Sequence, residues 1–414
     1  MSVMVKTITI ALSLAACTWP VSIAAATAGS PPTYYFSDCQ AGATQGCVAG
    51  NDANPGTSLS APKRSMAGFD VNALPAGARL LFARGGSWAG FRLQVVNLNA
   101  TAANPIVFDA YGSGPAPLLN TPSFIAFEFG KYNEFAQDGG YTLRNLKLDG
   151  NGTGQWGMWL RSDLRNVTIE NVEITGFAIG IHVQSSCPLG IAELTVRNSN
   201  LHHNREHGML GRADNLLLEG NEVAHNNMDG GGREHGIYLS GGRNVVLRNN
   251  TFANNSAPGG VCNGGNLTVH GQVDGMLIEG NTITQVAASA GCYGFSITAA
   301  YSTAEFFRNT VIRNNTITNV GICAVCVSAA PGILIEGNKI FDNQPGTGQR
   351  AVLIPAIAPG PGDAADAGAI IRNNVVCFDA PGAGATVAQA PSAGSVTGNV
   401  YQTGAAARTG ACTR

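Results

Sequence analysis

The chain has 414 residues, of which 12% are charged, and its formal net charge at pH 7 is -2. This charge excludes the basic surface with which proteins bind nucleic acid, so no nucleic-acid partner is expected. Glycine, at 54 residues, exceeds its usual share of ~7%, and together with abundant Asn, Thr, Val and Ile it indicates many short strands joined by tight turns.

Residues 1–28 have the layout of a signal peptide. Lys6 supplies a positive start, residues 7–16 are apolar, and Ala-Thr-Ala at 26–28 is typical of a cleavage site. The run Leu-Ala-Ala-Cys that ends at Cys17 leaves open an outer-membrane lipoprotein. No later segment reaches ~18 uninterrupted apolar residues, so no integral membrane span is expected. The protein is predicted to be secreted or periplasmic.

Ten cysteines are present, one of them in the signal, and an oxidising compartment favours disulfides. Position along the chain suggests Cys39–Cys47 and Cys377–Cys412 as pairs. The spacing Cys-Ala-Val-Cys at 323–326 is interpreted as structural, because no second cluster supports zinc and a redox centre would favour a helix start. Three cysteines recur at about one repeat length and predict a bridge between coils: Cys262, Cys292 and Cys323.

The N-terminal part contains Gly-Asn-Asp-Ala-Asn-Pro-Gly-Thr-Ser at 50–58, a strand ending in Gly-Gly at 80–86, and Asn-Pro-Ile at 104–106. This order resembles the start of secreted polysaccharide lyases and their relatives. Residues 29–75 are therefore predicted to form an N-terminal segment and cap, and residues 76–414 the main body.

From about residue 141 the sequence is periodic. One block, apolar-x-apolar-x-x-Asn-x-apolar, recurs at spacings between 23 and 36 residues. A constant block with variable spacing indicates a solenoid in which strands repeat and loops differ. Stacked asparagines can bond to one another's amides, so an asparagine ladder is predicted. Its members are Asn221, Asn250, Asn281, Asn315, Asn338, Asn374 and, as the last, Asn399.

A second block, Gly or Ala before apolar-x-apolar, lies upstream in each repeat. Two strands and a turn within ~25 residues are what one coil of a parallel β-helix needs, with coils stacked at ~4.8 Å. Together the blocks resemble the pectate-lyase-like superfamily over about residues 34–400. The predicted fold is all-β: a single-stranded right-handed parallel β-helix of about ten coils, with an asparagine ladder and an N-terminal cap. The resemblance implies a catalytic groove on the outer face of each coil's first strand.

Period-two alternation sorts the side chains of these first strands. Ionisable and aromatic outward residues concentrate between residues 157 and 272. The predicted inward residues are Met158, Leu160, Ile181, Val183, Ile237, Leu239, Leu267, Val269, Phe295 and Ile297. The predicted outward residues include Trp159, Arg161, His182, Arg212, Tyr238, Ser240 and His270.

The tetrad Arg-Glu-His-Gly occurs twice, at 205–208 and 233–236, and is interpreted as the same point on two neighbouring coils. His207 and His235 have inward parity but lie in a turn, where parity is a poor guide. A histidine near a tyrosine and an arginine has the parts for β-elimination on a uronic acid: arginine neutralises the carboxylate, a base removes the C5 proton, and tyrosine protonates the leaving oxygen. The predicted catalytic residues are His235, Tyr238, Arg233, His270 and Glu234. The predicted substrate-binding residues are Trp159, Arg161, His182, Glu206, His207, Arg212 and Ser240.

Other readings remain open. Glu206 and Glu234 on adjacent coils would lie ~5 Å apart, which is the spacing of a retaining glycoside hydrolase, although the chain has no Asp-Asp motif. The same parts on both sugar faces would give a C5-epimerase. The histidines could instead only shape the turn, by bonding a neighbouring coil's carbonyl, and the β-helix could serve adhesion. Calcium is left open, with Glu206, Glu234 and Asp229 as oxygen donors. The expected partner is a polysaccharide, and a monomer is expected.

Overall fold

The structure is a computed structural model, and the predicted signal, Cys17, Cys187 and Cys262 lie outside the residues that it describes. The described residues are 30–39, 47–131, 138–161, 163–184, 190–231, 233–255, 264–285, 292–343, 350–355 and 360–413, the side chain of Cys292 excepted.

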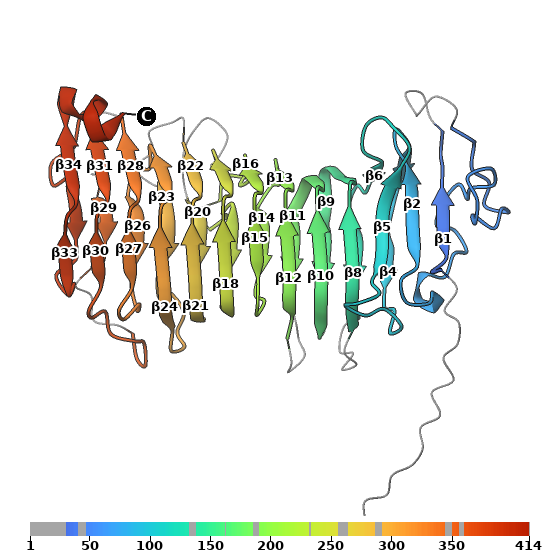
Figure 1. Cartoon of the computed structure of the whole chain (residues 1–414), viewed down its shortest axis with the longest axis horizontal. Helices are drawn as coiled ribbons and strands as arrows, with labels where there is room; N and C mark the ends of the chain where they lie inside the picture. The colour runs from blue at the N-terminus through green and yellow to red at the C-terminus, as the bar shows by residue number, and fades with distance from the viewer. Residues whose placement is uncertain are drawn as a thin grey trace, which may run out of the picture.

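The chain folds into a right-handed parallel β-helix whose coils stack along one axis from the N-terminal to the C-terminal end (Figure 1). Sheet A holds thirteen strands, more than the predicted ten coils, because the N-terminal region adds strands that carry no asparagine block. Its strands are, in order, β1 (Thr33–Phe36), β2 (Arg79–Ala83), β5 (Ile106–Tyr111), β8 (Asp138–Arg144), β10 (Leu164–Glu170), β12 (Ala192–Arg197), β15 (Leu217–Glu219), β18 (Gly242–Arg248), β21 (Gln272–Glu279), β24 (Phe306–Arg313), β27 (Leu334–Glu336), β30 (Ile370–Arg372) and β33 (Ser395–Thr397).

Two further rows of strands close each coil, and the long strands β9 (Lys147–Leu160) and β11 (Glu173–Val183) belong to both. The first-strand row, predicted to carry the groove, contains β4 (Leu93–Val95), β7 (Ile125–Phe129), β14 (His207–Gly211), β17 (Ile237–Leu239), β20 (Gly264–Val269), β23 (Cys292–Ile297), β26 (Cys323–Val327), β29 (Arg350–Leu353) and β32 (Thr386–Gln389). The third-strand row contains β3 (Ser87–Ala89), β6 (Leu118–Asn120), β13 (Asn200–His202), β16 (Glu222–Ala224), β19 (Thr251–Ala253), β22 (Thr282–Thr284), β25 (Thr316–Thr318), β28 (Lys339–Asp342), β31 (Val375–Phe378) and β34 (Val400–Thr403).

Helical structure in the described residues is limited to three short 3-10 helices: η1 (Val71–Ala73), η2 (Gly404–Arg408) and η3 (Gly410–Cys412). None of these has the length and apolar character that a membrane crossing requires. The last two pack against β31 at the C-terminal end, where the predicted disulfide Cys377–Cys412 is present. The predicted disulfide Cys39–Cys47 is also present near the other end.

The core is a column of apolar side chains inside the coils. All ten residues predicted to point inward from the first strands are at most 2% exposed, which confirms the alternation. Aromatic rings dominate the N-terminal part of this column, where Phe108 meets Phe127 and Phe127 stacks on Phe129 with ring centres 5.7 Å apart. Burial of these rings supplies the main stabilisation of the stack, because each removes a large apolar area from water.

The predicted asparagine ladder is present in the turn between sheet A and the third-strand row. Each Nδ2 donates to the Oδ1 of the next member at 2.9–3.0 Å, and the same Oδ1 accepts the preceding asparagine's backbone N–H. Buried amides are thereby satisfied within the stack. All seven predicted asparagines take part, and Ser199 continues the row toward the N-terminus.

The residue before each ladder asparagine has a left-handed backbone, which explains why Gly and Asn alternate there. Gly280 has φ 65°, and a Cβ added to it would lie 2.6 Å from Oδ1 of Asn249 in the preceding coil. Asn249 itself has φ 56°. The Asn249 side chain therefore packs against Gly280 of the next coil, and only glycine leaves room for it there.

One disulfide differs from the predicted pattern. Cys323 is bonded to Cys326 within β26 and so cannot form the bridge to Cys262 or Cys292 that the repeat spacing suggested. The bond of the Cys-Ala-Val-Cys run thus links two positions of one strand. A bridge between Cys262 and Cys292 stays a prediction, because Cys262 lies outside the described residues. The equal spacing of the three cysteines reflects the coil length, which places residues at one level without deciding which pair is close enough to bond.

Candidate active site

Outward residues of the first strands lie in register along the helix axis. Trp159, His182, Leu210 and Tyr238 are successive pairing partners on β9, β11, β14 and β17. Because strands repeat at ~4.8 Å, this row passes from one coil to the next in steps of that size. The two Arg-Glu-His-Gly tetrads end at the same level of adjacent coils, since Met209 pairs with Ile237 just after them.

His207 and His235 lie on the outer side of this row, in contact with Tyr238. The ring of His235 stacks on Tyr238 with centres 5.6 Å apart, and the ring of His207 lies 6.0 Å from the same tyrosine. The alternation is broken at Gly236, where a Cβ would approach Asn266 O to 2.7 Å. His235 and Tyr238 therefore share a face although they are three positions apart, and the inward parity of the two histidines does not describe them.

The hydrogen bonds of these two histidines determine which ring nitrogen carries the proton. Nδ1 of His207 accepts the backbone N–H of His235 at 2.9 Å, and Nδ1 of His235 accepts that of Gly265 at 3.0 Å. A backbone N–H can only donate, so each neutral ring carries its proton on Nε2. Burial lowers the pKa of His207 to about 4, and burial with the neighbouring His207 and His270 lowers the pKa of His235 to about 3. Both rings are neutral at pH 7.

His270 has the opposite arrangement. Its Nδ1 lies within hydrogen-bond distance of the carbonyl of Thr298. A carbonyl can only accept, so Nδ1 of His270 carries the proton and the neutral ring has its lone pair on Nε2. The ring centre lies 5.4 Å from Tyr238 and 5.5 Å from Tyr301. Among the histidines around Tyr238, this is the one whose free nitrogen can accept a proton without breaking a described hydrogen bond.

Tyr238 and Tyr301 share a hydrogen bond between their hydroxyl groups at 2.6 Å. Burial, followed by this hydrogen bond and the charges of Tyr301 and Glu305, raises the pKa of Tyr238 well above its usual range. The Tyr238 hydroxyl therefore keeps its proton across the physiological pH range. Tyr301 is 42% exposed and connects this hydroxyl to solvent.

The loop that presents Tyr301 is held by a fully buried carboxylate. Glu305 accepts the backbone N–H groups of Gly271, Ala300 and Tyr301. It thereby links the residue after His270 to the loop of Tyr301. Neither Tyr301 nor Glu305 was among the predicted site residues, because they follow β23 in a loop that carries no repeat motif.

A second aromatic group lies toward the N-terminal end of the same face. The rings of Trp159 and His182 are parallel within 5° and 6.1 Å apart, and Trp156 lies 4.6 Å from His182. The guanidinium of Arg161 lies 3.5 Å above Trp159 and is ion-paired with Glu128. Trp159, Arg161 and His182 were predicted to bind substrate, and the structure brings them together. Trp156 was missed because a glycine after it breaks the alternation.

The carboxylates of the tetrads form a separate group. Burial raises the pKa of Glu206, helped by the charges of Glu234 and Asp229 and opposed by Arg205, which pairs with Asp229 at 3.5 Å. The causes that shift the pKa values of the two tetrad histidines are burial, neighbouring histidines and backbone N–H groups, and no carboxylate is among them. Within the described ranges, no group of three or more His, Cys, Asp or Glu side chains could hold a metal ion.

The remaining predicted residues lie on the rim. Arg212, Ser240 and His270 follow one another on successive coils, each through a backbone N–H bonded to the previous coil. Arg212 and Arg233 are exposed, and Ser240 is half-buried. Two coils, or ~10 Å, separate Arg212 from His270, so a carboxylate bound between them is within reach of the long arginine side chain.

A second asparagine ladder supports the turn that precedes these first strands. Nδ2 of Asn204 donates to Asn226 and Nδ2 of Asn226 to Asn255, both at 2.9 Å, and Asn255 continues to Asn266 at 3.1 Å. All four side chains are fully buried. This ladder was not predicted, although the sequence carries a signal for it: Asn204, Asn226 and Asn255 each lie five residues after a position of the first row, Ser199, Asn221 and Asn250. Its effect is to fix the turns that lead into His207 and His235.

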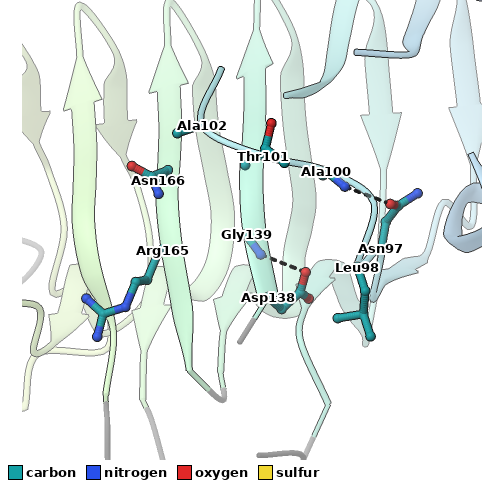
Figure 2. Close-up of a pocket in the computed structure, with 10 residues that line it drawn as sticks. Asn97, Leu98, Ala100, Thr101, Ala102, Asp138, Gly139, Arg165 and Asn166 are labelled. Atoms are coloured by element: carbon teal, nitrogen blue, oxygen red, sulfur yellow. Dashed lines mark hydrogen bonds between the residues drawn. The ribbon is translucent and has the colours of Figure 1, made fainter. Parts of the chain in front are cut away.

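A cavity of about 270 Å³ lies elsewhere, on sheet A, beneath residues 97–102 (Figure 2). The Oδ1 atoms of Asn97 and Asp138 accept the backbone N–H groups of Ala100 and Gly139 there. The first bond lies within the loop and the second within β8, and the loop is joined to β8 by the backbone N–H of Asn97, which donates to the Tyr141 hydroxyl at 2.7 Å. The cavity contains no acid–base cluster like that around Tyr238, so it is not the candidate active site.

Comparison with known proteins bears on the fold. Residues 134–273 match the family described as "Right handed beta helix region". No curated protein matches the sequence. A GH136 lacto-N-biosidase from Eubacterium ramulus has a TM-score of 0.51 at 15% identity, over 90% of this chain and 68% of its own. The chain has the right-handed β-helix fold.

Two other solved structures share this fold. The Dettilon tailspike protein has a TM-score of 0.54 at 14% identity, over 78% of this chain and 59% of its own. PfbA, a surface adhesin of Streptococcus pneumoniae, has a TM-score of 0.51 at 13% identity, over 73% of this chain and 77% of its own. At such identities the likeness establishes the fold alone.

Proposed function

We propose that this protein is an exported polysaccharide lyase that cleaves a uronic-acid-containing polysaccharide by β-elimination at the face formed by Tyr238, His270 and Tyr301. The observation that carries the proposal is the complementary protonation of two neighbouring groups. His270 has a free Nε2 lone pair, whereas the pKa of Tyr238 is raised so that its hydroxyl stays protonated. A base and an acid on one face are what elimination requires.

In the proposed reaction Nε2 of His270 takes the C5 proton of a uronate residue. The electrons of the C–H bond form a C4–C5 double bond, and the bond from C4 to the glycosidic oxygen breaks. The Tyr238 hydroxyl gives its proton to that oxygen and is reprotonated through Tyr301. Arg212, two coils from His270 on the same edge, is positioned to pair with the carboxylate of a neighbouring sugar of the same chain.

This assignment revises the role proposed for His235. Its Nδ1 is occupied by the N–H of Gly265 and its Nε2 carries the proton, so it cannot accept another proton without breaking that bond. The base role passes to His270, which was also a predicted catalytic residue. Trp159, Arg161 and His182, two to three coils from Tyr238, provide a surface on which a sugar ring of the same chain can stack.

A glycoside hydrolase remains the second candidate, because burial and like charges raise the pKa of Glu206 beside Glu234 on the next coil. A raised carboxyl pKa is what a general acid needs. An epimerase would use the His270 and Tyr238 pair without cleavage. Export to the periplasm or the medium as a monomer completes the proposal, and the disulfides at both ends fit an oxidising compartment.

The test is the ultraviolet absorbance of unsaturated uronate during incubation with pectate, alginate and other uronate polysaccharides. A lyase raises this absorbance, a hydrolase releases reducing ends without it, and an adhesin does neither while binding. His270→Gln should lower the elimination rate by about a hundredfold or more. His225→Asn, on an exposed turn with φ 53°, is the matched control and should leave the rate unchanged. Unaltered elimination in His270→Gln would refute the assignment of the base.

A further inference from the structure

Two histidines on adjacent coils repeat one hydrogen-bonding pattern. Each accepts a backbone N–H of the following coil at Nδ1 and keeps its proton on Nε2. No described hydrogen bond takes up either Nε2–H. Their ring centres lie 5.7 Å apart, close to the ~4.8 Å coil repeat. The chain therefore places two N–H donors, one per coil, beside Tyr238.

These donors are held neutral. Protonating Nδ1 of either ring would break its bond to the next coil and place a cation in a site where His207 and His235 are only 7% and 6% exposed. None of the described ion pairs includes either ring. Two neutral, oriented donors in a largely water-free position can bind a charge without titrating themselves, since no reorganisation is needed as the charge develops.

We propose that His207 and His235 bind the carboxylate of the sugar that is cleaved, with their two Nε2–H groups as a paired donor site. Loss of the C5 proton sends negative charge onto that carboxylate, and the two donors strengthen their hydrogen bonds as it builds up. Neither histidine gains or loses a proton. This assignment rests on the proposed elimination and names the group that the site recognises, a uronate carboxylate rather than a neutral sugar.

The position of His207 and His235 relative to the proposed acid and base supports a carboxylate site. Both rings contact Tyr238, and His270 contacts Tyr238 from the following coil. A sugar placed on Tyr238 would thus have the base on one side and the paired donors on the other.

Two substitutions at one position separate this role from a structural one. In His235→Asn the amide oxygen stands where Nδ1 stands and can still accept the N–H of Gly265, but no donor reaches the position of Nε2–H. In His235→Gln the longer side chain restores a donor near that position and loses the acceptor. The same pair is made at His207. Binding of tetragalacturonate and tetramannuronate, and of their carboxyl-reduced counterparts, is measured by calorimetry alongside the melting temperature.

We expect the wild type to bind one of the two uronate tetramers at least tenfold more tightly than its carboxyl-reduced form. His235→Asn should weaken that binding about tenfold or more, the loss expected for one hydrogen bond to a charged group, with its melting temperature retained. His235→Gln should retain binding within a few-fold and melt lower. The reduced tetramers should bind all variants alike.

The inference is overturned if His235→Asn binds the uronate tetramer as the wild type does, or if the wild type does not prefer either uronate tetramer to its reduced form. These outcomes are independent of turnover. Wild type that shows the expected binding but forms no unsaturated product would retain the carboxylate site and refute the proposed elimination. Unsaturated product together with normal binding by His235→Asn and His207→Asn would retain the proposed elimination and refute the carboxylate site.

Discussion

The hydroxyl groups of Tyr238 and Tyr301 lie 2.6 Å apart although 63 residues separate them in the chain. Tyr238 projects from a first strand, whereas Tyr301 comes from the loop that follows β23, two coils farther along. Glu305 holds that loop through three backbone N–H groups, one of them next to His270. The acid, its route to solvent and the base of the proposed elimination are thereby tied to one buried carboxylate.

Replacing Tyr301 by phenylalanine should shift the alkaline limb of the pH–rate profile to lower pH. The hydrogen bond from Tyr301 is one of the causes that raise the pKa of Tyr238, so its removal lowers that pKa and deprotonates the acid earlier as pH rises. The rate of unsaturated-uronate formation from neutral to alkaline pH measures this. Tyr401→Phe, at the C-terminal end, should leave the profile in place, and an unshifted alkaline limb in Tyr301→Phe would contradict the prediction.

Stability should fall as the pH drops from about 6.5 toward 4. The pKa values of His207 and His235 are lowered from 6.5 to about 4 and about 3, so over this interval the unfolded chain binds protons that the folded chain does not, and folding becomes less favourable. The free energy of unfolding lost through His207 alone is on the order of 3 kcal/mol. Urea unfolding at several pH values measures this loss.

A His207→Asn, His235→Asn double variant provides the control for that measurement. It removes both titrating rings and keeps an acceptor for each backbone N–H, so its free energy of unfolding should vary less between pH 6.5 and 4. An equally steep pH dependence in the variant would show that other groups cause the loss.

Asn281→Ala should destabilise the fold by roughly 2–4 kcal/mol, because it leaves buried donors and acceptors of both neighbouring rungs without a partner. Asn281 accepts the N–H and Nδ2–H of Asn250 and donates to Asn315. Asn399→Ala, at the part-buried end of the ladder, should cost less. Chemical denaturation of the two variants gives the comparison, and equal losses would indicate that the ladder is not cooperative along its length.

Gly280→Ala should be more destabilising than Gly332→Ala. The two glycines have nearly the same backbone, with φ 65° and 67°, so the strain of a left-handed alanine is common to both. A Cβ at Gly280 would lie 2.6 Å from Asn249 Oδ1, whereas a Cβ at Gly332 would meet nothing within 4 Å. The difference in melting temperature isolates the contact between coils. Equal melting temperatures would mean that the Asn249 side chain can move aside.

The repeats made the fold predictable. Each coil needs one strand block and one asparagine block, so the positions of Asn221 and its six partners and the inward side of residues such as Ile237 and Leu239 follow from local pattern. Straight strands alternate faces whatever their neighbours are. This regularity also placed Tyr238 and His270 on the outer face and brought the two Arg-Glu-His-Gly tetrads to adjacent coils.

Local pattern failed where the backbone leaves that regularity. Gly236 breaks the alternation and turns His235 outward. The last member of the second ladder, Asn266, lies outside the five-residue spacing that relates Asn204, Asn226 and Asn255 to the first ladder. Tyr301 reaches Tyr238 from a loop whose path depends on Glu305. The bond between Cys323 and Cys326 likewise depends on distances inside one strand.

The sequence by itself thus determined the coil, its core and the face on which ionisable residues gather. These features depend on side-chain alternation and on sequence blocks that recur in each coil. Only the tertiary structure decided which nitrogen of each histidine carries the proton. That depends on whether the neighbouring coil offers His235 an N–H, from Gly265, or offers His270 a carbonyl, from Thr298. Both partners come from a later coil, and only stacking brings them within hydrogen-bond distance.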